Sequence, residues 1–169
     1  MTRVVGIDPS LTATGIATPE VLLTVKHPKL RGAERLIALR DAILHRIGTP
    51  DLIVLEGYSY GSRGRGMLNL GELGGVIRVA FHEAGYPLAI VPPAVLKRYA
   101  TGRGNCVKEL VGTAAVRRLD IDPADSDQAD AAWLRAMGCD AVGEPLCPMP
   151  AAHRAALKGV DWPDQTLPV

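Results

Sequence analysis

The chain has 169 residues, 47% of them hydrophobic, and a formal net charge of +1 at pH 7. This length and composition suit one compact domain that buries its core without disulfides or a structural metal. The nearly balanced charge excludes recognition of nucleic acid through overall positive charge alone, but it leaves room for a local basic surface.

The N-terminal part of the chain predicts three strands followed by a helix. Residues 3–8 are a short apolar run, and residues 12–17 continue with β-branched residues after the turn-forming Asp8-Pro9-Ser10. We therefore expect two antiparallel strands, with residues 21–25 as a third. Over residues 33–47 the apolar side chains recur at helical spacing, which predicts a helix.

The middle of the chain alternates between strand and helix patterns. Residues 51–56 are almost continuously apolar, as in a strand that is covered on both faces, and they end in Glu56. Residues 57–66 are rich in glycine, serine, arginine and tyrosine without periodicity, which predicts a surface loop. A helix over residues 70–84 and a strand over residues 88–91 follow.

The last core elements are predicted to be helices. Pro92-Pro93 opens a short helix, and an amphipathic helix over residues 107–119 follows a glycine-rich turn. Asp125 is a candidate N-cap of the final core helix because Gln128 stands three residues later, as in a capping box. This order of strands and helices predicts an α/β fold, in which a mixed sheet has helices packed on its faces.

We place the end of the folded domain at residue 138. Residues 1–138 would form the domain, and residues 139–169 a proline-rich C-terminal extension with a short helix near residues 151–158. Three cysteines, an odd number without zinc-site spacing, predict free thiols. The chain shows no signal-peptide pattern and no apolar run near the roughly 20 residues of a membrane span, so we expect a cytoplasmic protein with no membrane partner.

Four acidic residues stand out as candidate catalytic and metal-binding groups. Asp8 ends the first predicted strand, Glu56 ends the buried strand, and Asp127 and Asp130 lie three apart on the last core helix. Residues three apart on a helix project to the same side, so these two can converge on one point. Asp8, Glu56 and Asp127 also have ordinary explanations as a turn former, a strand-end acid and a first-turn helix acid, whereas Asp130 lies beyond the first turn and fits such an explanation less well. Both interpretations remain open on the pattern alone.

A cluster of these carboxylates would imply a divalent metal. Two carboxylates about 4 Å apart repel each other by about 4 kcal/mol at an effective dielectric near about 20, and cations or protonation relieve this repulsion. Ligand sets made only of oxygen favour Mg²⁺, with Mn²⁺ as a substitute. A basic stretch over residues 97–118 precedes an acidic one over residues 120–130, which predicts a basic surface beside an acidic pocket.

Four groups of short motifs follow one another between about Arg3 and Met137. They are Gly6-Ile7-Asp8-Pro9 with Thr14-Gly15, Val54-Leu55-Glu56, Val95-Leu96-Lys97 with Gly102-Arg103-Gly104 and Lys108, and Asp127-Gln128-Ala129-Asp130-Ala131. In this order and spacing the chain resembles the RuvC family of Holliday-junction resolvases, which are crossover junction endodeoxyribonucleases of the ribonuclease H-like superfamily.

The resemblance implies a ribonuclease H-like mixed five-stranded sheet and an endonuclease that nicks Holliday junctions or other branched DNA. Asp8, Glu56, Asp127 and Asp130 would hold two Mg²⁺ ions per active site, and no small-molecule cofactor is expected. Two ions about 3.5 to 4 Å apart can activate the attacking water and stabilise the leaving oxygen. Hydrolysis would leave a 5′ phosphate and a 3′ hydroxyl.

The resemblance also implies particular contacts to DNA. Lys97 and Lys108 lie where the family has lysines that engage the scissile-strand phosphates, and Lys108 near a helix N-terminus suits an anion and a catalytic role. Arg103 would join them in binding DNA. Each of these cations also has an ordinary interpretation as a solvated surface charge.

The loop after Glu56 departs from the family. Where family members place a phenylalanine that wedges into the junction, this chain has Ser59. Tyr58 and Tyr60 flank that position and are candidates for stacking on an unpaired base, a contact worth about 1 to 3 kcal/mol, or for plain loop tyrosines. Arg63 and Arg65 are candidates for contacts to phosphates.

Family members act as homodimers through the helix that follows this loop. Gly71, Gly74 and Gly75 are each less favourable in a helix than alanine by about 0.8 to 1 kcal/mol. Close approach of another backbone, in a second subunit or inside the monomer, would explain them. Ser10-Leu11 resembles diverged, phage-encoded members, which predicts relaxed junction specificity.

Two other functions remain open. Thr12-Ala13-Thr14-Gly15 after an early aspartate also fits the first phosphate loop of an actin-like ATPase or a sugar kinase, but such folds need two lobes and this length supplies one. A non-catalytic junction-binding protein would be expected to have lost at least one of the four acids, and all four are present.

Overall fold

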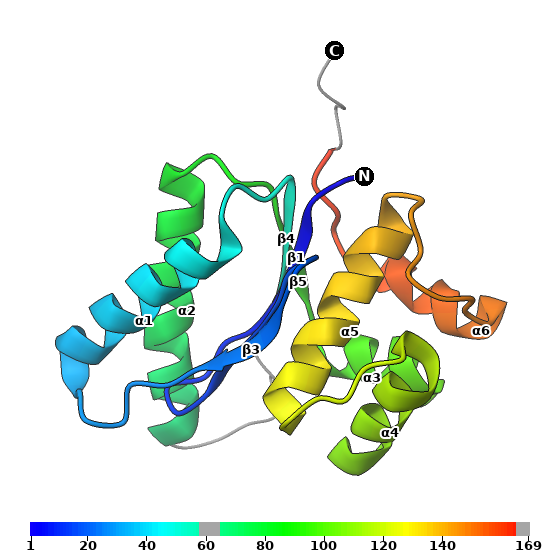
Figure 1. The fold of residues 1–169 in the computed structure, drawn as a ribbon, viewed down its shortest axis with the longest axis horizontal. Helices are drawn as coiled ribbons and strands as arrows, with labels where there is room; N and C mark the ends of the chain where they lie inside the picture. The colour runs from blue at the N-terminus through cyan, green and yellow to red at the C-terminus, as the bar shows by residue number, and fades with distance from the viewer. Residues whose placement is uncertain (58–64, 165–169) are drawn as a thin grey trace.

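A mixed sheet forms the centre of the molecule (Figure 1). The structure, a computed structural model, describes residues 1–57 and 65–164, without the side chains of residues 65–70. Within these residues the strand order is β3-β2-β1-β4-β5. The strands are β1 (Val4–Asp8), β2 (Thr14–Ala17), β3 (Leu22–Val25), β4 (Leu52–Glu56) and β5 (Leu88–Val91). Because β1 pairs antiparallel with β2 and parallel with β4, the predicted mixed sheet is confirmed.

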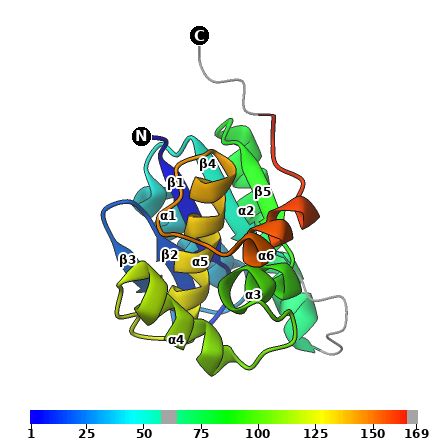
Figure 2. The same cartoon turned by 90° about the vertical axis from the view of Figure 1, so that its right-hand side faces the viewer.

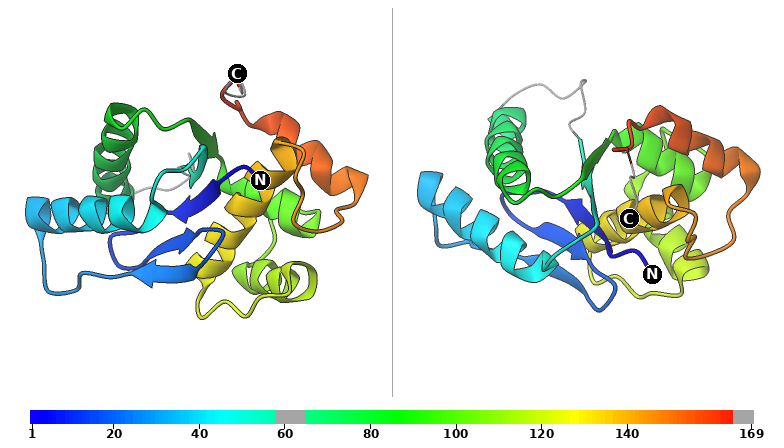
Figure 3. Two further views of the ribbon diagram at one scale, coloured as in Figure 1. Left: turned by 45° about the horizontal axis from the view of Figure 1, so that its top comes forward. Right: turned by 90° about the horizontal axis from the view of Figure 1, so that it is seen from above.

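Helices cover both faces of this sheet. They are α1 (Gly32–Ile47), α2 (Arg65–Glu83), α3 (Pro93–Thr101), α4 (Lys108–Leu119), α5 (Ser126–Ala141) and α6 (Ala151–Arg154), which continues into the 3₁₀ turn η1 (Ala155–Gly159). Figure 1 and Figure 3 show α1 and α2 on one face, with α5 and then α3, α4 and α6 on the other. This three-layer arrangement confirms the predicted α/β class.

The observed elements follow the predicted ones closely, with two differences. α2 begins at Arg65, ahead of the expected residues 70–84, so residues 65–66, predicted to belong to the surface loop, are helical. α5 continues to Ala141, past the expected end of the domain at residue 138. None of the helices in the described part of the chain combines the length and the apolar character that crossing a bilayer requires.

Alternation along the strands separates two cores. Ile7 and Leu55 point to one face of the sheet and pack with side chains of α1 and α2. Val54 points to the opposite face and packs with side chains of α5. Since successive side chains of a strand alternate between faces, Asp8 and Glu56 lie on the α5 face.

Three glycines let α5 lie directly on the sheet. A Cβ atom at Gly6 would come to 2.1 Å from the carbonyl oxygen of Ala131, and one at Gly15 to 2.1 Å from that of Asp127. A Cβ atom at Gly138, on α5 itself, would come to 2.6 Å from strand side chains. Because no real Cβ atom fits at such distances, these glycines allow the close approach of helix and strands.

The start of α5 is held by a capping network. The Asp125 carboxylate accepts a hydrogen bond from the backbone N–H of Gln128 at 2.9 Å, and the Gln128 side chain accepts one from Ala124 at 3.0 Å. The Thr24 hydroxyl of β3 donates to Asp125 at 2.9 Å. The predicted cap is therefore confirmed, and it also ties the first turn of α5 to the edge of the sheet.

Candidate carboxylate active site

Asp8 and Glu56 lie side by side at the carboxyl ends of neighbouring strands. β1 and β4 are parallel and pair Ile7 with Leu55, so the two acids are the next residues along. Their carboxyl groups share a hydrogen bond. Asp8 is only 6% exposed, while Glu56 is partly exposed. The carboxyl ends of parallel strands are where α/β sheets place their ligands.

The turn after Asp8 is fixed by its own hydrogen bonds. The Thr14 hydroxyl donates to the Ser10 carbonyl at 2.7 Å and accepts from the Ser10 N–H at 3.1 Å. Thr14 is fully buried. Asp8 is thus held at the beginning of an ordered turn between two paired strands.

α5 brings two further acids to the same place. Asp130 is 8% exposed, and Asp127, in the first turn, is half-buried. Both carboxylates interact electrostatically with Asp8 and with Glu56. The four acids selected from the sequence therefore converge from β1, β4 and α5.

Burial and mutual repulsion raise the pKa of every carboxyl in this cluster. Burial raises the pKa of Asp130 to about 7, and the charge of Glu56 adds to the rise. Burial, and then the charge of Glu56, also raise the pKa of Asp8 well above its usual range. The pKa values of Glu56 and Asp127 rise mainly through burial as well. Such groups hold protons until cations replace them.

Within the cluster, the carboxyls of Asp8 and Glu56 interact directly, and burial, followed by the charge of Glu56, raises the pKa of Asp8. No group of three or more acid, histidine or cysteine side chains among the described residues is arranged to hold a metal ion. The donor set still fits a hard divalent cation, because all four groups offer oxygen, the ligand atom that such cations prefer.

Two lysines face the acids from neighbouring helices. Lys97 of α3 and Lys108, the first residue of α4, both counter the rise in pKa that burial causes at Glu56 and Asp130. Lys108 acts on Asp127 in the same way. These positive charges and the N–H groups at the start of α4 would attract a phosphate to the edge of the acidic cluster.

The other predicted DNA contacts are not part of this cluster. Arg103 is exposed in the turn after α3, and within the described residues its side chain has no hydrogen bond or ion pair. Tyr58, Tyr60 and Arg63 lie outside the described residues. Arg65 is the first residue of α2, but its side chain also lies outside that description.

Two hollows flank the carboxylates. One, of about 330 Å³, is lined by Glu56, Pro9 and Arg78 on the side of α2. The other, of about 340 Å³, is lined by Lys108 and Asp125 between α4 and α5. Of the four acids, only Glu56 lines either hollow, and Lys108 borders the second one.

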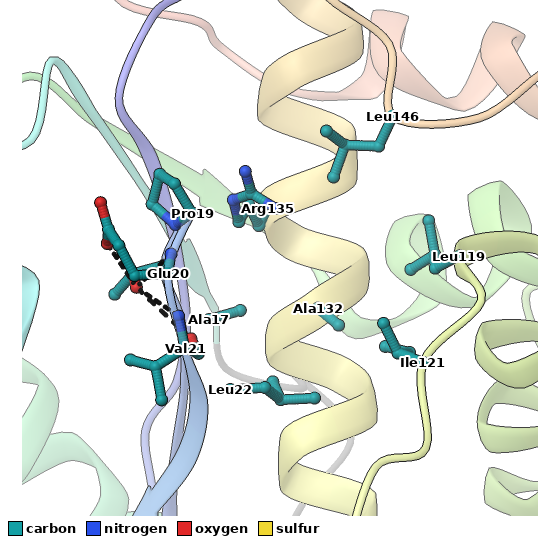
Figure 4. Close-up of a pocket in the computed structure, with 11 residues that line it drawn as sticks. Ala17, Pro19, Glu20, Val21, Leu22, Leu119, Ile121, Ala132, Arg135 and Leu146 are labelled. Atoms are coloured by element: carbon teal, nitrogen blue, oxygen red, sulfur yellow. Dashed lines mark hydrogen bonds between the residues drawn. The ribbon is translucent and has the colours of Figure 1, made fainter.

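A further pocket, of about 220 Å³, lies beside α5 and contains none of the four acids (Figure 4). Apolar side chains such as Leu22 and Ala132 line it together with Arg135. The Arg135 side chain donates to the backbone carbonyl of Val4 at 3.2 Å. Since Val4 begins β1 and Asp8 ends it, this pocket is separate from the carboxylate cluster.

Sequence reasoning does not identify the residues that support the acids. Gly6 and Gly15 belong to the first motif, but only the packing shows that α5 lies against them. A glycine inside a strand is the one general signal in the sequence for such a close approach of another backbone. Thr24 binds the cap of α5, and Lys26 lies 4.0 Å from Asp125. These two polar residues have no signal in the sequence pattern.

Comparison with known sequences finds related nucleases, although no family model matches the chain. The chain is 30% identical over 155 residues to the crossover junction endodeoxyribonuclease RuvC of Mycobacterium avium strain 104, and the match covers 81% of each protein. RuvC of Mycobacterium tuberculosis strain H37Ra gives the same identity over the same length, again covering 81% of each protein.

Solved structures agree with this relationship. Thermus thermophilus RuvC matches with a TM-score of 0.66 and 26% identity, covering 84% of this chain and 97% of that one. The same protein in complex with a Holliday junction substrate matches with a TM-score of 0.69, covering 85% and 98%. A yeast mitochondrial Holliday junction resolvase, 15% identical with a TM-score of 0.53, shares the fold. These likenesses confirm the expected ribonuclease H-like fold.

Proposed function

Because the chain belongs to the family of RuvC crossover junction endodeoxyribonucleases, we propose that it nicks Holliday junctions or other branched DNA. The reaction is hydrolysis of a phosphodiester bond, and it leaves a 5′ phosphate and a 3′ hydroxyl. The match to a RuvC structure that holds a Holliday junction substrate supports branched DNA as the substrate class.

The observation that carries this proposal is the convergence of the acids with two lysines at the carboxyl ends of the strands. Burial raises the pKa of Asp8 and of Asp130, so their ionised forms are unfavourable without a cation. Lys97 and Lys108 supply positive charge beside them. A mainly structural role would not require four desolvated carboxyls at one point, because like charges at close range are destabilising.

Asp8, Glu56, Asp127 and Asp130 would hold two divalent ions, Mg²⁺ with Mn²⁺ as a substitute. When bound, such ions supply Lewis-acid stabilisation of the charge that develops on the scissile phosphate. The carboxylates themselves would provide the negative charge that retains the ions, and the raised pKa of Asp8 means that a cation competes with a proton there.

The lysines would position the DNA strand. Lys108 is exposed at the start of α4, where its ammonium and the free backbone N–H groups can both contact a phosphate. Lys97 is half-buried on α3 and is therefore more restricted in position. Together they would hold the scissile phosphate against the acids, and Arg103 would contact the strand further out.

We also propose that the protein acts as a homodimer through α2. Among the described residues, a Cβ atom at Gly75 would meet nothing within 4 Å, so packing against them does not explain this glycine. Val79, one turn after Gly75 on the same helix, is 57% exposed. A surface of this kind admits close approach of a second α2, which would place two active sites on one junction.

Cleavage of defined substrates tests the proposed activity. A labelled four-way junction, a fork, a flap, a bubble and a linear duplex are incubated with the protein and Mg²⁺, and the nicks are mapped. We expect the branched substrates to be cut and the duplex to be spared. Asp8→Asn should bind the junction but not cut it.

The matched control is Asp41→Asn, which alters an exposed carboxylate of α1 that pairs only with Arg40. It should cut at the wild-type rate. Failure of the wild-type protein to cut any branched substrate, or equal cutting by Asp8→Asn, would overturn the proposed function.

A further inference from the structure

A buried carboxylate outside the active site joins three parts of the chain. Asp140, near the end of α5, has a side chain that is 0% exposed. The Arg154 guanidinium of α6 donates to both of its oxygens, from Nε at 3.0 Å and from Nη2 at 2.6 Å. The Tyr99 hydroxyl of α3 donates to the same carboxylate at 2.9 Å. The carboxylate is therefore fully engaged by groups from α6 and α3.

The segment that contains Arg154 packs along α3. Figure 2 shows α6 and the turn after it beside α3. The Nδ1 atom of His153 lies 2.8 Å from the carbonyl oxygen of Tyr99. A Cβ atom at Gly102 would come to 2.9 Å from the same imidazole ring. Further along, Ala156 and Val160 are buried in the core that includes α3. We call residues 150–160 the strap.

The helix under the strap carries one of the two lysines that face the acids. Lys97 lies two residues before Tyr99 on α3, and its charge acts on Glu56 and on Asp130. Asp130 belongs to α5, the helix that also carries Asp140. The contacts of Asp140 thus set the position of α3 against α5, which are the helices that present Lys97 and Asp130.

Stability alone is a weak explanation for this ion pair. Asp140 is buried, but the Arg154 side chain is 52% exposed, so solvent screens their attraction, and partly exposed pairs of this kind add little to stability. Its directional contacts do fix one arrangement of helices. The Tyr99 ring adds an edge-to-face contact with Trp133 of α5, with ring centroids 5.9 Å apart. Both contacts favour a single spacing between α3 and α5.

We propose that the strap positions Lys97 for cleavage, with Arg154, Asp140 and Tyr99 as positioning residues. The proposal rests on the proposed nuclease function, since Lys97 matters only if a DNA strand is held and cut there. It gives the strap a role in the active site, although none of residues 150–160 has a contact with the four acids in the described part of the chain. A misplacement of about 1 Å in a reacting group can lower a rate by about a hundredfold.

A double-mutant cycle on the full-length protein tests the proposal. Single-turnover cleavage of a four-way junction is measured at saturating protein for wild type, Arg154→Ala, Lys97→Ala and the double variant, with junction binding measured alongside. In the wild-type background we expect Arg154→Ala to slow cleavage about tenfold to a hundredfold. In the Lys97→Ala background the same change should slow cleavage by less than about twofold, because the group it positions is gone.

Lys158→Ala, at an exposed position of the strap, is the matched control and should cleave at the wild-type rate. Tyr99→Phe removes only the hydroxyl that binds Asp140, so it replaces Arg154→Ala in the cycle if that variant does not fold. It should slow cleavage less than Arg154→Ala does, and again only when Lys97 is present. Equal slowing in both backgrounds would mean a general effect on the fold and would overturn the strap proposal alone. Absence of cleavage by wild type would instead remove the proposed function on which it rests.

Discussion

Gly15 of β2 pairs with Asp8 across the sheet and packs against the backbone of Asp127 on α5. A Cβ atom at this position would come to 2.1 Å from the Asp127 carbonyl oxygen. The absence of a side chain at Gly15 therefore helps α5 to bring its acids over β1. Together with Gly6, this glycine sets how closely Asp127 approaches Asp8.

Gly15→Ala should consequently displace α5 and separate Asp127 from Asp8. Overpacking of a filled core costs about 1 to 3 kcal/mol, and a clash with backbone leaves little room for adjustment, so we expect a loss at or above the upper end of this range. Urea unfolding monitored by circular dichroism measures it. Gly112→Ala is the control, since its Cβ meets nothing within 4 Å and alanine favours a helix. Equal stability of Gly15→Ala and wild type would contradict the close approach.

The raised pKa of Asp130 predicts an unusual dependence of stability on pH. In the unfolded chain this carboxyl releases its proton near about pH 4, but in the folded protein it keeps the proton up to about pH 7. The folded state therefore binds more protons across this window, and the contribution of Asp130 to the free energy of unfolding falls as pH rises through it. Each pKa unit corresponds to about 1.4 kcal/mol.

Urea unfolding in the presence of a chelator, for wild type and Asp130→Asn at several pH values, measures this contribution. The unfolding free energy of wild type, relative to that of Asp130→Asn, should fall between about pH 4 and about pH 7 and then level off. Mg²⁺ at the upper pH should restore the unfolding free energy of wild type but not that of the variant, because an ion that binds the folded state stabilises that state. A difference that does not change with pH would refute the raised pKa.

Lys108→Ala should weaken binding of junction DNA in a way that depends on salt. If this lysine contacts a phosphate, its loss reduces the slope of log affinity against log salt by about 0.9, the value for one contact on duplex DNA. Fluorescence anisotropy across a series of salt concentrations gives the slope. Lys29→Ala, an exposed lysine before α1, should leave it unchanged. An unaltered slope for Lys108→Ala would remove the phosphate contact from the proposed mechanism.

Gly75→Glu should turn a dimer into a monomer without unfolding the chain. Within the described residues nothing lies within 4 Å of a Cβ atom at this position, so we expect the folded monomer to tolerate the substitution. Across a two-fold interface between α2 helices it would add bulk and like charges at close range. Sedimentation equilibrium measures the mass, with Ala33→Glu on the exposed start of α1 as the control. A dimer that survives Gly75→Glu would place the interface elsewhere.

The sequence predicts most elements of this fold because their signals are local. The apolar runs that become β1 and β4 and the helical spacing of α1 are properties of neighbouring residues, and neighbouring residues decide local conformation. The cap at Asp125 is also local, since its partner is Gln128. The early start of α2 at Arg65 is missed, because Arg65 and Gly66 continue the glycine- and arginine-rich composition of the stretch before them.

The sequence by itself determined the identity and order of the four acids and placed Asp8 and Glu56 at strand ends. Only the tertiary structure decided that they meet, because their convergence depends on the strand order and on the packing of α5 against Gly6 and Gly15. These glycines contact residues of α5 that lie more than a hundred positions away in the sequence. The same holds for Asp140, which the sequence predicts to lie in the C-terminal extension, past the end of the last core helix. Its burial and its partners on α3 and α6 follow from tertiary packing. Once packing removes water from a carboxylate, the group needs specific hydrogen-bond partners, and these partners fix the positions of the helices that carry them.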